Sequence, residues 1–456
     1  MEKCPWITSG LLKSIKSRDA LYKRFTKEKN PEIRQRLHFK YKAFRNKTLA
    51  LLRKCKRDYY TQFFENNRTN MKTVWNEIRQ IVNISKKSGS VSKSFKIGNE
   101  YIDDTVKIAT EFNQHFSSIG KKIQTGIKKS KKTFLEYLEA PSDTRFKFSA
   151  TTEEEVLTII HSLKKSKAFG PYSIPANLLR SFSGYFAKPL TYIFNLCMFE
   201  GTFPSELKKA MVIALHKKGD KNKLTNYRPI SLLSNLGKIF EKIVHKQIYE
   251  YMHVNDKFYQ RQFGFRTKHS TGHALSSMIE FIKNKLDKKI FVGGIFIDLE
   301  KAFDTIDHGT LLEKLDHYGI RETENQWFKS YLSERSQFVS IEGKESAPEK
   351  VDCGVPQGSV LGPLLFLIYI NDMHKCLKNV VFHFADDTSF LCPGSNPSFI
   401  IKELKKDMST LYDWLCANKL SLNVAKTEFI LFKPPKSKIL PVHIKFMGKK
   451  FMKRKK

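Results

Sequence analysis

The sequence predicts a mixed α+β fold preceded by a basic helical extension. Within residues 150–432, amphipathic stretches alternate with short apolar runs, which is the pattern of helices mixed with strands. Within residues 1–84, apolar positions recur at roughly helical spacing and Lys or Arg fills the positions between them. The chain has 456 residues and is 41% hydrophobic, so it can form a substantial core and roughly two to four domains.

The charge balance favours a nucleic-acid partner. The chain holds 81 Lys and Arg against 45 Asp and Glu, a formal net charge of +36. Binding to a polyanion is favourable because each neutralised phosphate releases condensed counterions. The alternative is a basic surface that is merely solvated, but the excess is distributed through the whole chain, which favours the partner.

Cysteine usage and hydropathy predict a soluble protein of a reducing compartment, the cytoplasm or the nucleus. The seven cysteines are widely spaced and include no C-x-x-C pair, so neither a disulfide framework nor a zinc site is indicated. The most apolar stretch, 360–370, is too short to span a bilayer and contains Gly362 and Pro363. The first residues lack a signal-peptide pattern, and no membrane partner is expected.

The N-terminal extension is the most basic part of the chain. Residues 1–60 hold 18 Lys and Arg against 5 Asp and Glu. The apolar positions that define its helical stripe are Leu37, Tyr41, Phe44, Leu49 and Leu52. Such a helix either lies on nucleic acid or is a solvated arm, and the overall charge favours nucleic acid.

Turn and cap signals divide the remainder of the chain. Residues 85–95 form a Gly/Ser/Lys linker within a connecting region, 85–149. Thr152 and the acidic residues after it predict the start of a helix over 156–163. Asp307 is a plausible N-cap for a helix over 311–318, which Gly319 ends. Residues 433–456 form a short basic tail.

Two apolar runs deliver aspartates in a way that suits metal-dependent phosphoryl transfer. Residues 292–297 end on Asp298, and residues 380–391 predict a buried strand–turn–strand with Asp386 and Asp387 at the turn. Carboxylates that converge from strand ends can hold two divalent cations about 4 Å apart. An Asp-Asp pair alone usually marks an exposed turn. The presence of Asp298 at the end of a second apolar run favours a metal site instead. The neighbouring Glu300, Asp304 and Asp307 are expected to be solvated or capping carboxylates.

Six ordered blocks carry a family resemblance. They are His216–Asp220 with Asn226–Leu233; Gln262–Arg266 with His269–Thr271; Asp298–His308; Gly354–Pro363; Phe384–Asp387; and Asn418–Asn423 with Lys426–Thr427. In this order they resemble the reverse transcriptases of non-LTR (LINE-type) retrotransposons, particularly jockey-like elements. The resemblance implies a right-hand polymerase fold, with fingers and palm in 150–432 and a pre-fingers region before it. The basic helical extension at 1–84 precedes both.

The resemblance also implies roles for individual residues. Catalytic carboxylates that hold two Mg²⁺ ions, or Mn²⁺, would be Asp298, Asp386 and Asp387. Lys426 resembles a lysine that protonates pyrophosphate, against the alternative of a solvated lysine. The residues that would bind the incoming nucleotide are Arg228 and one of Lys217 and Lys218 at the triphosphate, Phe303 as a steric gate against a 2′-hydroxyl, and Gln357 with Gly358 near the dNTP and the primer–template. For Phe303 the alternative is a core aromatic.

The implied activity is RNA-directed DNA synthesis by nucleotidyl transfer from dNTPs to a primer 3′-hydroxyl, with template RNA and primer DNA as partners. An RNA-dependent RNA polymerase is the competing enzyme, and a catalytically inactive remnant that only binds RNA or DNA is the competing non-enzyme. The chain departs from the family pattern at Tyr172, where an aspartate is usual. We also expect a fragment without an upstream endonuclease domain and without most of the thumb, which makes 433–456 a truncated tail. The sequence does not indicate an oligomeric state.

Overall fold

The computed structural model divides the chain into two compact units, residues 1–90 and 91–456. The residues that the structure describes are 4–82, 94–97, 100–164, 170–171, 174–435, 437, 443–446 and 449–452. Most of the predicted linker, Tyr172 and much of the basic tail therefore lie outside the described residues. The division falls near the predicted end of the extension, at residue 84, and no second division separates residues 94–149 from residues 150–432.

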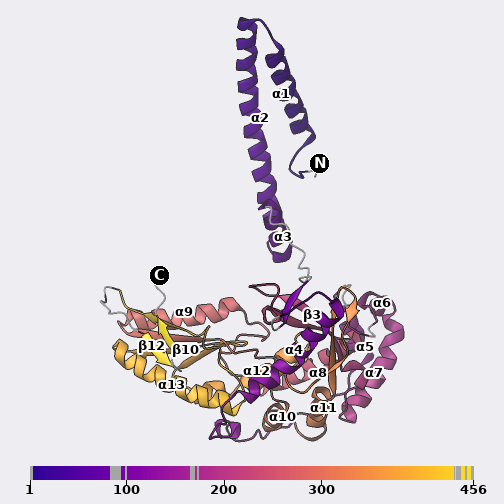
Figure 1. Cartoon of the computed structure of the whole chain (residues 1–456), viewed down its shortest axis with the longest axis vertical. Helices are drawn as coiled ribbons and strands as arrows, with labels where there is room; N and C mark the ends of the chain where they lie inside the picture. Colours follow the sequence, from indigo (N-terminus) through magenta and orange to yellow (C-terminus); the bar gives the residue numbers. More distant parts are fainter. Residues whose placement is uncertain are drawn as a thin grey trace. The chain divides into compact units, whose positions relative to one another are not determined.

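The N-terminal unit is built from helices. Its elements are α1 (Ser9–Lys27), α2 (Pro31–Asn66) and α3 (Met71–Ile81). Helices α1 and α2 run side by side as a hairpin (Figure 1). Aromatic contacts join them, with ring centroids 5.2 Å apart for Tyr22 and Tyr41 and 4.8 Å apart for Phe25 and His38. The predicted helical extension is thus confirmed.

One position of the predicted apolar stripe on α2 is wrong. Leu49 is 38% exposed, whereas Thr48 is 1% exposed. Thr48 follows Phe44 by four residues and so stays on the same helix face, while Leu49 follows by five and is rotated away from it. The Thr48 hydroxyl is satisfied locally, because it donates to the Phe44 carbonyl at 2.8 Å. A small hydroxyl residue therefore continues the stripe.

The second unit contains a five-stranded sheet and one long helix. A separate two-stranded hairpin, β1 (Phe95–Ile97) and β2 (Glu100–Ile102), comes first and is followed by the helix α4 (Thr105–Thr125). The five strands of the sheet are β3 (Lys209–His216), β4 (Tyr227–Leu232), β6 (Arg335–Ile341), β7 (Lys344–Glu345) and β8 (Glu349–Val351). The sheet order is β4-β3-β6-β7, with β8 also paired to β6. Phe95, Phe112 and Phe116 pack with Tyr227 and Val339 in one buried cluster. Part of the region predicted as linker and pre-fingers thus shares a core with this sheet.

The second unit also contains a set of α-helices and short 3₁₀ turns. These helices are α5 (Glu153–His161), α6 (Ala176–Ser181), α7 (Ser183–Phe199), α8 (Asn235–Val254), α10 (His308–His317), α11 (Glu322–Leu332) and α12 (Leu361–Ile370). Short 3₁₀ turns are η1 (Phe134–Tyr137), η2 (Ser205–Leu207), η3 (Leu224–Asn226) and η4 (Met373–Cys376). The predicted N-caps are confirmed: Thr152 caps α5, and Asp307 caps α10 by accepting from the Thr310 amide at 2.9 Å. Both helices begin three residues earlier than predicted.

A four-stranded antiparallel sheet, in the order β11-β5-β10-β9, forms the centre of the remaining fold. Its elements are β5 (Phe291–Ile297), β9 (Val380–Phe384), β10 (Asp387–Gly394) and β11 (Glu428–Phe432), with α9 (Thr271–Asp287) and α13 (Pro397–Ala417) beside it. A further hairpin joins β12 (His443–Phe446) to β13 (Lys449–Met452). Helices α9 and α13 lie on opposite sides of the four-stranded sheet (Figure 1). The mixed α+β prediction is confirmed, and both faces of the predicted strands are covered.

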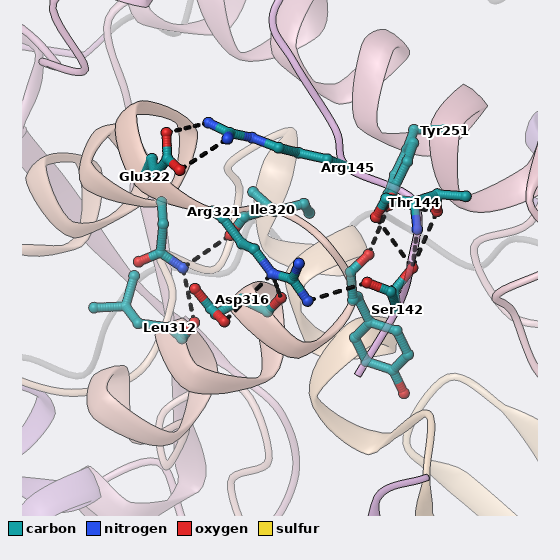
Figure 2. Close-up of polar contacts among 11 residues, drawn as sticks. Ser142, Thr144, Arg145, Tyr251, Leu312, Asp316, Ile320, Arg321 and Glu322 are labelled. Atoms are coloured by element: carbon teal, nitrogen blue, oxygen red, sulfur yellow. Dashed lines mark hydrogen bonds and ion pairs between the residues drawn. The ribbon is translucent and has the colours of Figure 1, made fainter. Parts of the chain in front are cut away.

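The segment between α4 and α5 contacts the helices α8 and α11 and the loop between α10 and α11 (Figure 2). Arg145 pairs with Glu322 of α11, and the Tyr251 hydroxyl of α8 donates to the Thr144 carbonyl at 2.9 Å. Arg321 donates to the Ser142 carbonyl at 3.1 Å. These contacts attach residues 142–145 to the rest of the unit. No helix among the described residues is both long and apolar enough to cross a membrane.

Candidate active site

The turn between β9 and β10 carries the paired aspartates. Asp387 pairs with Phe384, so Ala385 and Asp386 alone form the loop of the hairpin. Ala385 has φ of +57°, in the left-handed region that two-residue hairpin loops require at their first position. The predicted strand–turn–strand is confirmed, with Asp387 as the first residue of β10 rather than part of the loop.

Strand register brings Asp298 to the same point. Thr388 pairs with Ile297 in the antiparallel β5–β10 ladder, so one further step sets Asp387 opposite Asp298. Residues directly opposite each other share a sheet face, with Cβ atoms about 5 Å apart. Burial and then the charges of Asp386 and Asp298 raise the pKa of Asp387. Three predicted carboxylates from two distant segments therefore lie together.

Asp298 is held by two donors from the loop before β11. The Lys426 ammonium lies 2.5 Å from Asp298 Oδ2, and the Asn423 side-chain amide donates to the same oxygen at 2.9 Å. The Asn423 backbone amide also donates to the Asp298 carbonyl at 2.9 Å. Lys426 was predicted at the site, whereas Asn423 was not. The signal for Asn423 was available, because it lies in the last of the six sequence blocks.

The carboxylate oxygens are suitable ligands for a hard divalent cation. Across the described residues, no three acidic, His or Cys side chains form a ready-made cage for a metal ion. Mg²⁺ is usually held by one or two carboxylates together with waters and substrate phosphates, rather than by a cage of protein ligands alone. Carboxylates that approach from neighbouring strand ends, with open space beside them, meet that requirement.

A cavity of about 690 Å³ lies in front of Asp298 and Asp386, whereas Asp387 is not among its lining residues. Its lining includes Asp298, Asp386, Lys426, Phe303, Gln357, Gly358, Lys217 and Arg228. Lys218 is not among the lining residues, so of the two candidate lysines only Lys217 borders this cavity. Burial and then the charges of Arg228 and Lys426 lower the pKa of Lys217. His115 and Ile119 of α4 also line the cavity, and no sequence block indicated them.

Phe303 and Gln357 form the floor of the cavity. The Phe303 ring stacks on Phe366, with centroids 4.8 Å apart, and still lines the open space. The Gln357 side-chain amide donates to both carboxylate oxygens of Asp304, at 2.9 and 3.0 Å. Burial raises the pKa of Asp304 to about 6. The expectation of a solvated or capping Asp304 is therefore wrong, because its carboxylate is desolvated and orients Gln357.

Gly358 lets the Gln357 loop lie against β4. Its φ is +129°, and a Cβ there would come 2.5 Å from the Ser231 carbonyl oxygen. The Ser231 amide donates to the Gln357 carbonyl at 2.8 Å. No side chain fits in this contact, which explains why the segment between the two sheets needs glycine at this position.

Comparison with known proteins identifies one family over the part of the chain that holds the carboxylates. A family model described as reverse transcriptase (RNA-dependent DNA polymerase) matches residues 215–451. The chain is 32% identical over 309 residues to the RNA-directed DNA polymerase from mobile element jockey of Drosophila melanogaster, which covers 65% of this chain and 33% of that protein. It is 28% identical over 345 residues to the probable RNA-directed DNA polymerase from transposon BS of the same fly, covering 72% of this chain and 37% of that protein.

A third relative is the probable RNA-directed DNA polymerase from transposon X-element of Drosophila melanogaster, 28% identical over 302 residues, or 64% of this chain and 32% of that protein. The chain spans about a third of the length of these relatives. The carboxylates, the ordered blocks and all of the cavity's lining except His115 and Ile119 fall within the residues that the family model matches. The chain belongs to the reverse transcriptase family and is related to the enzymes of jockey-type non-LTR retrotransposons.

Proposed function

We propose that the chain is an RNA-directed DNA polymerase that extends a DNA primer on an RNA template with dNTPs. The observation that carries this proposal is the convergence of Asp298, Asp386 and Asp387 at paired strand ends, with Asp298 and Asp386 facing Lys217 and Arg228 across one cavity. An acidic wall suits divalent cations, and a basic wall suits a triphosphate. In this proposal the four-stranded sheet is the palm, and the five-stranded sheet with α4 belongs to the fingers.

Asp298 and Asp386 would be the firmer metal ligands, with Asp387 beside them. When bound there, two Mg²⁺ ions, or Mn²⁺, would lower the pKa of the primer 3′-hydroxyl and neutralise charge on the departing pyrophosphate. Lys426 already lies in the site, 2.5 Å from Asp298 Oδ2. Once released from that carboxylate, its ammonium would serve as the proton donor to the pyrophosphate.

The remaining residues would bind and select the nucleotide. Arg228 suits a bidentate grip on phosphate oxygens, and Lys217 adds a point charge beside it. Phe303, supported from behind by Phe366, would fill the volume that a ribose 2′-hydroxyl needs. Gln357, oriented by Asp304, would contact the new base pair. Lys218 is left without a role at the triphosphate.

A second proposal concerns the α1–α2 hairpin, which would bind template RNA. Residues 9–66 hold 17 Lys and Arg against 5 Asp and Glu. Exposed aromatic and aliphatic side chains lie among these charges, such as Phe39, which is 77% exposed. Unpaired bases stack on such rings, and phosphates neutralise the lysines. Self-association is disfavoured, because two such surfaces would bring like charges together.

Primer extension tests the enzyme proposal against its two rivals. A DNA primer on a homopolymer RNA template is incubated with Mg²⁺ and either dNTPs or rNTPs. We expect dNTP incorporation. A preference for rNTPs would favour an RNA-dependent RNA polymerase, and binding of the primer–template without extension under either condition would favour a non-catalytic RNA- or DNA-binding chain.

A further inference from the structure

We propose that Gln262 is a positioning residue for polymerisation: its side chain fixes the Ala385 turn that presents Asp386. The inference rests on the proposed function, because it assigns Asp386 to the reaction. Gln262 itself does not line the cavity and would touch neither nucleotide nor primer.

The Gln262 side chain is buried and bonded to the turn. It is 3% exposed, and its Oε1 accepts from the Ala385 amide at 3.1 Å and from the Gly264 amide at 2.8 Å. One carbonyl oxygen therefore joins two backbone segments that are more than a hundred residues apart in sequence. This hydrogen bond therefore holds the backbone of Ala385, the residue immediately before Asp386.

The backbone around Gln262 continues the sheet beyond β9. Gln262 and His383 form an isolated parallel bridge. The Phe263 amide donates to the His383 carbonyl at 2.8 Å, and the His383 amide donates to the Arg261 carbonyl at 2.9 Å. Residues 261–263 thus lie along β9 and hold the Gln262 side chain beneath the hairpin loop.

Gly264 brings this segment against the loop itself. A Cβ on Gly264 would lie 2.1 Å from the Ala385 amide nitrogen and 2.8 Å from its Cα. Such an approach is open only to glycine. The two backbones are in contact at the turn, so a shift in either one moves the other.

The turn needs such support because its first loop position is an alanine. A residue with a Cβ is disfavoured at a φ of +57°, where hairpin loops normally place Gly or Asn. Strained backbone of this kind persists only where surrounding contacts enforce it. Removing the acceptor oxygen would leave two buried amides unsatisfied and allow Ala385 to relax, and Asp386 would move with it.

The test compares variants that separate the hydrogen bonds from the volume of the side chain. Gln262→Met keeps the size and removes the acceptor, whereas Gln262→Glu keeps an acceptor for both amides. The double variant Gln262→Met with Ala385→Gly removes the acceptor and also the strain. Gln260→Met is the matched control, because Gln260 is exposed and only two residues away.

Each variant is measured in primer extension and in Mn²⁺ titration by calorimetry, after circular dichroism has established folding. We expect Gln262→Met to lower kcat on the order of 10- to 100-fold with little change in the KM for dNTP. Mn²⁺ binding should weaken in the same variant. Gln262→Glu and the double variant should recover most of both, and Gln260→Met should match the unaltered chain.

Equal behaviour of Gln262→Met and Gln260→Met would overturn the inference, as would a double variant no better than the single one. If Gln262→Met does not fold, a Gln262→Glu variant that folds but binds Mn²⁺ no better than Asp386→Asn overturns it as well. Failure of the proposed function is distinguishable. A chain that extends no primer yet loses Mn²⁺ affinity only in Gln262→Met supports the positioning role alone, and a chain that neither binds Mn²⁺ nor extends a primer contradicts both.

Discussion

The four-stranded sheet and the α1–α2 hairpin are organised in opposite ways. In the sheet, Asp298, Asp386 and Lys426 come from three separate segments and meet through strand register and hydrogen bonds. In the hairpin, the two helices are consecutive in the chain, and the lysines and arginines are mostly exposed. The first region fixes a few groups in one geometry, and the second distributes charge over a long surface.

Because of this difference, we expect the sheet to control the reaction rate and the hairpin to control RNA affinity. Chemistry that depends on position is lost when one fixed group is removed, because the others cannot replace it. Binding that depends on many exposed charges is lost gradually, because each charge contributes a similar small amount. Variants of the sheet should therefore change kcat, and variants of the hairpin should change RNA affinity and its dependence on salt.

The largest effect is expected from Asp386→Asn. The substitution keeps the size of the side chain and removes the charge that a divalent cation requires. Primer extension should fall on the order of 1,000-fold or more, whereas RNA affinity measured by filter binding should stay within about twofold. Asp256→Asn, on an exposed carboxylate outside this cavity, is the control and should leave the rate unchanged. An Asp386→Asn chain that retained most of its activity would remove the aspartate from the reaction.

The next largest effect is expected from Phe303→Val. A smaller side chain leaves room for a ribose 2′-hydroxyl beside the ring of Phe366. The preference for dNTP over rNTP, measured as the ratio of kcat/KM values, should fall on the order of 10- to 100-fold. Phe399→Val provides the matched loss of an aromatic ring, since Phe399 is 47% exposed on α13. An unchanged ratio would indicate that Phe303 is a core aromatic and not a steric gate.

The sequence predicted the parts of this site that are local or carried by a block. The hairpin turn with Asp386, the Asp307 cap and the apolar strand before Asp298 each arise from a short pattern. The six blocks identified Lys217 or Lys218, Arg228, Phe303 and Gln357 as candidates, but only the fold separated Lys217 from Lys218.

The features that could not be predicted depend on contacts between distant segments. The sequence around Asp304 resembles a solvated turn, and only packing against Gln357 shows that the carboxylate is desolvated. His115 lies on α4, far from every block, and reaches the cavity because α4 packs on the five-stranded sheet. Thr48 replaces Leu49 in the hairpin because the position on the helix face outweighs the hydrophobicity of the residue.

A smaller effect is expected from the hairpin. Deleting residues 1–84 should weaken RNA affinity and reduce its dependence on salt, while the second unit stays folded. Replacing Lys40 and Lys47 on α2 by Gln should lower the slope of log K against log salt by up to about 0.7 for each lost phosphate contact. The control is replacement of Lys402 and Lys405 on α13, which removes the same charge from another exposed helix. Equal slopes for the two pairs would mean that the hairpin contacts no phosphate.

The smallest effect on catalysis, and the most specific, is expected from the pH dependence of Asp304, which should also be visible in stability. Burial raises its pKa to about 6 in the folded chain, above the usual 3.8, so the folded state binds more protons than the unfolded state between these values. Its contribution to stability is therefore present at low pH and is lost as pH rises from about 4 to about 6. Asp304→Asn should remove this loss, so that the variant gains stability relative to the unaltered chain by up to about 3 kcal/mol across that window.

The protonation of Asp304 should also affect catalysis. Above pH 6 the Asp304 carboxylate accepts from Gln357, and below it the protonated group holds the amide less firmly. The kcat/KM for dNTP should therefore decline a few-fold on the acidic side with an apparent pKa near 6, and Asp304→Asn should flatten this limb. The measurements are urea titrations and single-nucleotide incorporation between pH 5 and pH 8. An acidic limb that persists in Asp304→Asn would assign it to another group, and the orientation of Gln357 would then not depend on this charge.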